Sequence, residues 1–186
     1  MDCYITDRHT LPAGEPLLGA ISRNLAAGPG WIQVREKDLP ARELFALVRE
    51  ALNLPNPRGV KFIVNTRVDV ALASGAAGAH LPSSSPVPRL WRRLAPPGFL
   101  IGVSCHTVEE VRAAELEGAD YALFGPVFPP LSKTAGGAPR GLDELSLAAA
   151  SVRIPVLALG GITRENAPAC RAAGAAGVAG ISLYQL

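Results

Sequence analysis

Strand-like and helix-like segments alternate along the whole chain, and this alternation constrains the fold more than any other feature. Eight apolar runs of strand length are separated by seven segments whose apolar residues follow helical spacing. Strands that alternate with helices predict a parallel sheet with right-handed crossovers. Eight such strands indicate an α/β protein with a (β/α)8 TIM barrel fold, built as a single domain from residues 1–186. An open doubly wound sheet is the alternative.

The predicted strands cover residues 3–6, 31–35, 61–65, 78–81, 100–104, 121–124, 155–159 and 177–182. The predicted helices cover residues 15–27, 41–53, 67–74, 87–95, 107–117, 142–152 and 164–173. The chain is short for a fold that typically takes ~250 residues, and it stops after the last predicted strand. We therefore expect the eighth helix to be absent, which would leave the outer face of that strand bare and favour a homodimer.

Composition argues against several functional classes. A net charge of +2 and 5% aromatic residues are not typical of a nucleic-acid surface. No stretch approaches the ~20 apolar residues of a membrane helix, and the N-terminus lacks the pattern of a signal peptide. Cys3, Cys105 and Cys170 are widely separated, which favours reduced thiols. We expect a cytoplasmic protein with no nucleic-acid or membrane partner.

The segment Gln33-Val34-Arg35-Glu36-Lys37 places two cations and an amide on one face of the second predicted strand. Side chains alternate in an extended chain, so Gln33, Arg35 and Lys37 share a face while Glu36 points away. Burying an unpaired charge is costly, and the neighbouring sequence has no run of carboxylates that could pair with these cations. The segment therefore predicts an open site for an anion, most simply a phosphate.

Polar and small residues gather where the predicted strands end, which is where the active site of this fold lies. Among them are Asn65, Ser104 and His106; His106 is the better histidine for proton transfer, whereas His80 inside the fourth strand reads as a core residue. Loops after the seventh and eighth strands commonly bind phosphate through backbone N–H groups. The glycines at 160 and 161 and the residues at 181 and 182 fit such loops.

Residues 126–140 form the longest irregular segment of the chain. Ser132, Lys133 and Thr134 supply hydroxyls and a cation near its middle. Loops of this length in a compact domain are usually functional. We interpret this one as a lid that closes over an anionic ligand.

Several stretches together resemble one known family over essentially the whole chain. They are Tyr4–Asp7, Ile32–Leu39, Val64–Leu72, Gly102–Thr107, Gly118–Tyr121, Phe124–Pro129, Leu159–Ile162 and Gly177–Ala179. In these stretches the chain resembles the thiamine-phosphate synthase / TenI family. The combination of Gln-x-Arg-Glu-Lys with Gly-Pro-Val-Phe-Pro is the most specific part of the match.

The resemblance implies a TIM barrel of thiamine biosynthesis whose ligand is a phosphorylated thiazole or thiamine phosphate. In the synthases a pyrimidine diphosphate ionises with the help of Mg²⁺, and the thiazole nitrogen captures the cation. Carried over by motif, the diphosphate side is Gln33, Arg35, Lys37, Asn65 and Lys133, and the thiazole phosphate side is Ser132, Gly161, Ile181 and Ser182. Ser104 would lie near the pyrimidine, and the candidate catalytic residues are His106, Lys133 and Ser104.

Two residues that differ from the synthase pattern both stand at positions for binding Mg²⁺. Thr66 and Ser85 stand where the resemblance implies metal-binding aspartates, and Mg²⁺ is usually held by carboxylates. We therefore assign no metal ligand and expect no cofactor, with Mg²⁺ needed only by a synthase. The TenI branch contains metal-free thiazole tautomerases, but its histidine after the sixth strand is Pro126 here. We favour a TenI-like tautomerase, with a Mg²⁺-dependent synthase and a non-catalytic phosphate binder as alternatives.

Overall fold

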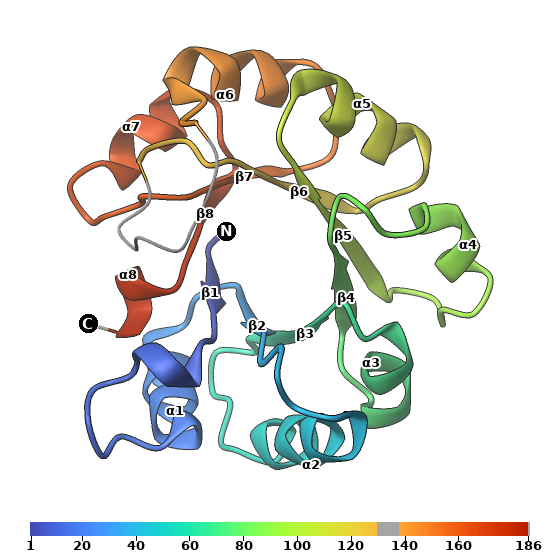
Figure 1. The fold of residues 1–186 in the computed structure, drawn as a ribbon, viewed down its shortest axis with the longest axis vertical. Coiled ribbons are helices and arrows are strands. Elements are labelled where there is room, and N and C mark those ends of the chain that lie inside the picture. The colour runs from blue at the N-terminus through green and yellow to red at the C-terminus, as the bar shows by residue number, and fades with distance from the viewer. Residues whose placement is uncertain (130–137, 186) are drawn as a thin grey trace.

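The computed structural model describes residues 1–129 and 138–185, and its strands form a closed parallel barrel (Figure 1). The strands pair in chain order, and β1 closes the barrel against β8. They are β1 (Cys3–Ile5), β2 (Trp31–Val34), β3 (Lys61–Asn65), β4 (Gly78–Leu81), β5 (Leu100–Cys105), β6 (Tyr121–Phe124), β7 (Val156–Leu159) and β8 (Gly177–Gly180). The predicted TIM barrel is confirmed, and the doubly wound alternative is wrong.

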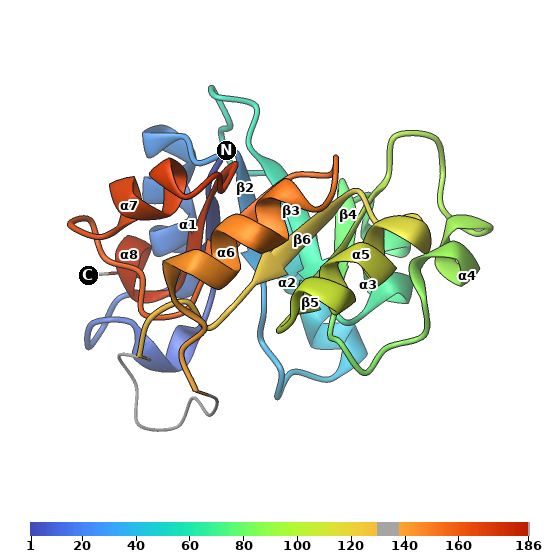
Figure 2. The same ribbon diagram turned by 90° about the horizontal axis from the view of Figure 1, so that it is seen from above.

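Helices surround the barrel on the outside, as the view from above also shows (Figure 2). They are η1 (Arg8–Thr10), α1 (Leu17–Ala27), α2 (Ala41–Leu52), α3 (Val68–Ser74), α4 (Pro88–Arg92), α5 (Val108–Leu116), α6 (Gly141–Ala150), α7 (Ala167–Ala172) and α8 (Ser182–Gln185). The predicted helices are present, and most are a few residues shorter than expected. None of the helices in the described ranges is long and apolar enough to cross a membrane.

Local capping explains where α5 begins. The hydroxyl of Thr107 accepts a hydrogen bond from the N–H of Glu110 at 3.2 Å. The Glu110 carboxylate in turn accepts from the N–H of His106 at 2.6 Å. These contacts satisfy N–H groups that have no partner inside the helix. The capping residue therefore fixes the exit of the chain from β5, where Ser104 and His106 are located.

Inward-facing side chains fill the barrel below its carboxyl-terminal mouth. This inner cluster consists of Cys3, Ile5, Trp31, Ile63, Tyr121, Leu123, Leu157 and Ala179. Gly102 makes room for the ring of Tyr121, because a Cβ at position 102 would lie 2.0 Å from Cζ of the tyrosine. The barrel is thus a packed core and not a pore.

The chain does not stop at the eighth strand. β8 ends at Gly180, and the single helical turn α8 follows and lies between α7 and α1 (Figure 1). The side chain of Gln185 donates hydrogen bonds to the Tyr4 hydroxyl and to the Asp7 carbonyl. Val178 on β8 is only 1% exposed. The expectations of a missing eighth helical element and of a bare strand eight are therefore wrong, because neighbouring helices already cover that strand. The homodimer stays a prediction without this support.

Candidate functional site

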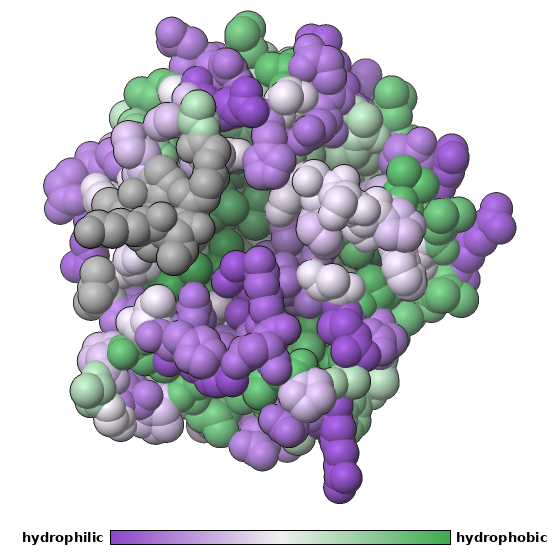
Figure 3. Space-filling view, viewed as in Figure 1, coloured by the Kyte–Doolittle hydropathy of each residue, from purple (hydrophilic) through white to green (hydrophobic). Residues whose placement is uncertain are grey.

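A cavity of ≈ 400 Å³ opens at the carboxyl ends of the strands. In the space-filling view, the mouth of the barrel is hollowed, with hydrophilic residues at its edge and hydrophobic residues deeper inside (Figure 3). Every strand except β4 contributes through its end or the following loop, and β4 contributes a side chain from within the strand. The lining includes Asp7, Gln33, Arg35, Asn65, His80, Ser104, His106, Pro126, Gly160, Gly161, Ile181 and Ser182.

The anion-binding groups predicted from the second strand lie at one side of this cavity. Gln33 and Arg35 line it, and Asn65 joins them from the end of β3. The guanidinium of Arg35 makes no ion pair within the described part of the chain. Gln33 is 1% exposed, yet its Nε2 has no hydrogen-bond partner there. Lys37 is exposed two residues beyond Arg35 and is not part of the lining. An amide and a cation that line one cavity and lack these partners in the described ranges suit an anionic ligand.

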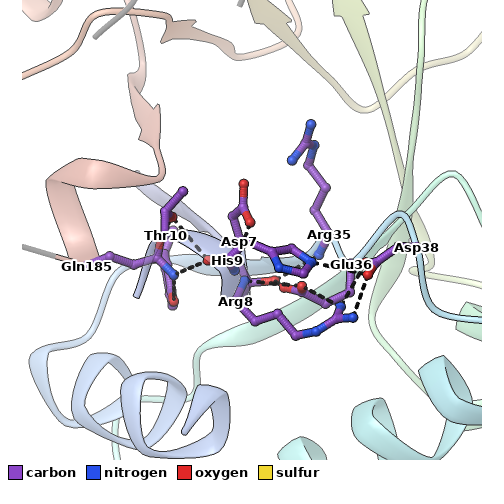
Figure 4. A network of polar contacts seen from close by, with 10 residues as sticks. Asp7, Arg8, His9, Thr10, Arg35, Glu36, Asp38 and Gln185 are labelled. Atoms are coloured by element: carbon purple, nitrogen blue, oxygen red, sulfur yellow. Dashed lines mark hydrogen bonds and ion pairs between the residues drawn. The ribbon is translucent and has the colours of Figure 1, made fainter. Parts of the chain in front are cut away.

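Glu36 points to the opposite side of the same loop and is fully engaged (Figure 4). Its carboxylate accepts hydrogen bonds from the Thr6 hydroxyl at 2.6 Å and from the guanidinium of Arg8 at 3.2 Å. Arg8 also pairs with Asp38, and this interaction, more than any other, lowers the pKa of the Asp38 carboxyl. We call Arg8, Glu36 and Asp38 the rim cluster.

The rim cluster also positions Arg35. The Thr6 hydroxyl donates to Glu36 and accepts the backbone N–H of Arg35 at 2.9 Å. Figure 4 shows the Arg35 side chain leaving the cluster and pointing away from it. Arg35 and Glu36 are neighbours in one loop, but extended backbone directs their side chains to opposite faces, so one lines the cavity and the other joins the rim cluster.

The loops after β7 and β8 form the other side of the cavity. Gly161 has a φ of +63°, and a Cβ there would lie 2.4 Å from the carbonyl oxygen of Pro129, so only glycine fits without strain. The backbone N–H groups of Gly161 and Ser182 donate to no backbone acceptor within the described ranges. The residues predicted from the sequence to hold a phosphate, Gly161, Ile181 and Ser182, therefore lie together here.

His106 lines the cavity from the loop after β5. Its Nδ1 lies 2.6 Å from the carbonyl oxygen of Gly125. A carbonyl oxygen can only accept, so Nδ1 carries a proton, and in the neutral ring Nε2 is then the unprotonated nitrogen. The neighbouring Cys105 is 1% exposed, and burial raises the pKa of its thiol to about 12, which disfavours the reactive thiolate.

His80 is a cavity-lining side chain that the sequence did not lead us to expect there. It is buried as expected of a core histidine, but it also lines the cavity and lies 2.8 Å from the Ser104 hydroxyl. Strand alternation carried the signal: Ala79 and Leu81 pack on the helix side, so His80 between them faces the interior. Ser104 reaches the same place from β5.

Comparisons with known proteins agree over the length of the chain. A sequence model of the family described as "Thiamine monophosphate synthase" matches residues 3–183. The chain belongs to this family.

Individual relatives give the same picture for this thiamine monophosphate synthase family member. A Geobacter sulfurreducens protein described as "Putative thiamine-phosphate synthase" is 48% identical over 96% of this chain and 83% of the relative. The thiamine-phosphate synthase of Chlorobium luteolum is 44% identical over 97% and 82% of the two chains. The solved structure of thiamine phosphate pyrophosphorylase from Pyrococcus furiosus is 35% identical with a TM-score of 0.85, covering 97% of this chain and 85% of that one. These descriptions support the synthase alternative better than the tautomerase that the sequence favoured.

The residues at the expected metal positions do not fit a protein-held Mg²⁺. Thr66 and Ser85 offer hydroxyls, and no group of three or more His, Cys, Asp or Glu residues in the described ranges could hold a metal ion. Thr66 has a φ of +63°, which is unusual for a β-branched residue and is typical of strained functional positions. The predicted lid residues Ser132 and Lys133 lie outside the described residues.

Proposed function

We propose that this family member is a thiamine-phosphate synthase, which joins a pyrimidine diphosphate to a phosphorylated thiazole. The observation that supports this most concerns two side chains on one side of a cavity whose other side is a glycine loop. Within the described residues, Arg35 makes no ion pair and the buried amide nitrogen of Gln33 has no hydrogen-bond partner. A substrate pair with anionic groups at both ends needs such a two-sided site. The names of the relatives point to the same reaction.

The reaction exchanges one bond at the pyrimidine methylene carbon for another. The bond from this carbon to the diphosphate oxygen breaks, and its electron pair leaves with the diphosphate. The lone pair of the thiazole ring nitrogen then forms a carbon–nitrogen bond, which yields thiamine phosphate and pyrophosphate. Arg35 stabilises the charge that grows on the leaving group. Holding both substrates in one cavity supplies their alignment.

The guanidinium of Arg35 offsets the diphosphate charge in this proposal, since the residues at positions 66 and 85 do not fit a magnesium site. Asn65 contributes its amide at the end of β3, where its Nδ2 donates to the Thr66 hydroxyl at 2.9 Å. The Thr66 hydroxyl can then donate onward to an anionic oxygen. This arrangement neutralises and orients the leaving group without a carboxylate-bound metal.

One observation favours a second function, thiazole tautomerisation. His106 lines the cavity with its Nε2 unprotonated in the neutral ring, which suits a base that moves a proton on a carboxythiazole phosphate. Such a reaction needs the phosphate side of the cavity and no metal. The catalytic role of His106 is assigned to this second candidate only.

Incubating the purified chain with each substrate set separates the candidates. With pyrimidine diphosphate and thiazole phosphate, the synthase forms thiamine phosphate and pyrophosphate in equal amounts, measured with and without added Mg²⁺. With carboxythiazole phosphate alone, only a tautomerase aromatises the ring. A Glu43→Gln variant, altered on the exposed side of α2, serves as the matched control. Absence of thiamine phosphate under both metal conditions would overturn the synthase proposal, and the absence of both products would favour a non-catalytic binder.

A further inference from the structure

We propose that His80 is a positioning residue that fixes the Ser104 hydroxyl as a hydrogen-bond donor toward the bound heterocycle. The identity of that heterocycle as a pyrimidine rests on the proposed function. The direction of the hydrogen bonds is independent of the proposed function. It follows from three side chains of the barrel interior: Tyr121 on β6, His80 on β4 and Ser104 on β5. We call these three residues the histidine relay.

The histidine relay is a continuous row of hydrogen bonds from the core to the cavity. The Tyr121 hydroxyl lies 3.2 Å from Nδ1 of His80. On the other side of the ring, Nε2 of His80 lies 2.8 Å from the Ser104 hydroxyl. Tyr121 is fully buried, whereas His80 and Ser104 line the cavity. The row therefore ends on the surface that a ligand touches.

The histidine in this row is neutral at physiological pH. It is 2% exposed, and burial lowers the pKa of its ring to about 3. Its two neighbours are hydroxyl groups, which do not compensate a charge as a carboxylate would. A neutral imidazole has one N–H and one lone pair, so only two directions of the row are possible.

The surroundings of Tyr121 decide between these directions. If Nδ1 of His80 carried the proton, the tyrosine would accept it, and the tyrosine hydrogen would need another acceptor. Within the described residues Gln33 is the other side chain that acts on the Tyr121 hydroxyl; its effect is to lower the pKa of Tyr121, as a nearby N–H donor does, so it supplies no acceptor for the tyrosine hydrogen. Leaving a buried donor unsatisfied is costly. The Tyr121 hydroxyl therefore donates to Nδ1, and the proton of the ring is on Nε2.

This direction of the hydrogen bonds determines what the Ser104 hydroxyl can offer to a ligand. Because Nε2–H of His80 donates to the Ser104 oxygen, the serine hydrogen is free to point into the cavity. The site thus presents a donor at this point and selects a ligand with an acceptor there, such as a ring nitrogen. A neutral histidine can hold this direction across the working pH range of an enzyme.

Packing keeps the row rigid. The Tyr121 ring lies over Gly102, where a Cβ would collide with it, and its centroid is 4.5 Å from that of Trp31. The His80 ring stacks on the same tyrosine with centroids 5.6 Å apart and an interplanar angle of 30°. A preorganised donor requires such support, because a mobile hydroxyl would lose part of its selectivity.

Two-bond ¹H–¹⁵N NMR spectra of the full chain test the direction of the row without any ligand. The His80 signals are assigned by their loss in a His80→Gln variant. We expect Nε2 in the protonated range and Nδ1 in the unprotonated range at neutral pH. A proton on Nδ1, or a charged ring, would overturn the relay.

Calorimetric titration with the pyrimidine diphosphate substrate of the synthases tests the effect on Ser104. We expect His80→Leu to weaken binding about tenfold, the size of one hydrogen bond to a ligand. The same change in a Ser104→Ala background should cost no more than about twofold, because the donor is already gone. His80→Gln, whose amide can replace Nε2–H, should retain most of the affinity. Equal losses in both backgrounds would show a merely structural role and overturn the proposal.

Inorganic pyrophosphate serves as the matched probe without a heterocycle. Its affinity should be unchanged in folded His80→Leu and Ser104→Ala variants, with melting curves as the check on folding. If the wild-type chain binds the pyrimidine diphosphate no more tightly than pyrophosphate, the heterocycle does not lie at Ser104. That result would overturn the ligand part of the inference, while the NMR result decides the relay separately.

Discussion

Two arginines at the ends of neighbouring strands differ in their surroundings. One is held in ion pairs with carboxylates, and the other lines the cavity. Arg8, after β1, pairs with Glu36 and Asp38. Arg35, after β2, makes no ion pair in the described ranges and lines the cavity. Proteins seldom leave a half-buried cation without a partner, because its desolvation is then uncompensated. The contacts of Arg8 therefore stabilise the fold, whereas the position of Arg35 suits the anionic ligand proposed above.

The largest effect is expected from Arg35→Ala on synthase turnover. Removing the cation that stabilises the leaving diphosphate should lower turnover about a hundredfold, as loss of one transition-state contact commonly does. The melting temperature should change little, since the guanidinium makes no ion pair in the part of the chain that the structure describes. Turnover comparable to wild type, measured as thiamine phosphate formed, would place the leaving group elsewhere.

Glu36→Gln should have the reverse effect, on stability more than on turnover. The new amide can still accept from Thr6, but its NH₂ group would face the guanidinium and backbone N–H of Arg8. We expect a loss of about 2 kcal/mol in the free energy of unfolding, measured by denaturant titration. A loss of turnover as severe as that of Arg35→Ala would contradict the view that Glu36 stabilises the fold while Arg35 acts on the substrate.

Thr66→Asn tests whether the backbone at the end of β3, beside the cavity residue Asn65, is strained. Asparagine tolerates positive φ better than a β-branched residue. We expect a gain of about 1 kcal/mol in unfolding free energy. A matched Thr107→Asn exchange at the α5 cap, where φ is −135°, should bring no such gain. Equal changes at both positions would argue against strain at Thr66.

The smallest effect concerns acid titration of the rim cluster. Hydrogen bonding to Arg8 holds the pKa of Asp38 below its ordinary value of 3.8, so the folded state favours the charged form. This stabilisation is present above the unfolded pKa and is lost as the pH falls through the lower folded pKa. Wild type and Asp38→Asn should therefore differ in stability at neutral pH and converge under strongly acidic conditions. High salt should shrink the neutral-pH difference, because the pair is exposed; a difference that persists in acid would contradict this.

Much of the fold could be predicted from the sequence because strand and helix periods are local properties. The Thr107 cap of α5 and the alternation of Arg35 and Glu36 both follow from residues close in the chain. The last element could not be predicted in this way. One turn of α8 is held by contacts of Gln185 with Tyr4 and Asp7, some 180 residues earlier.

In the candidate site, too, the residues that follow from local sequence were predicted, and those that depend on distant contacts were not. Gln33, Arg35 and Asn65 were indicated by strand ends and by the resemblance, and the fold brings them to one cavity. The link from Tyr121 through His80 to Ser104 joins three strands, so no local pattern could reveal it. The relatives support the synthase alternative better than the tautomerase that the sequence favoured, because two substituted metal positions had outweighed the similarity of the rest of the chain.

Calorimetric titration of inorganic pyrophosphate into the wild-type chain and Arg35→Ala tests the central claim most directly. The claim is that Arg35, which makes no ion pair among the described residues, binds a diphosphate at the end of β2. We predict measurable binding to the wild type and at least a tenfold loss in Arg35→Ala, consistent with about 1.5–3 kcal/mol for a hydrogen bond to a charged group. Unchanged affinity in the folded variant would contradict the assignment of this cavity as a diphosphate site.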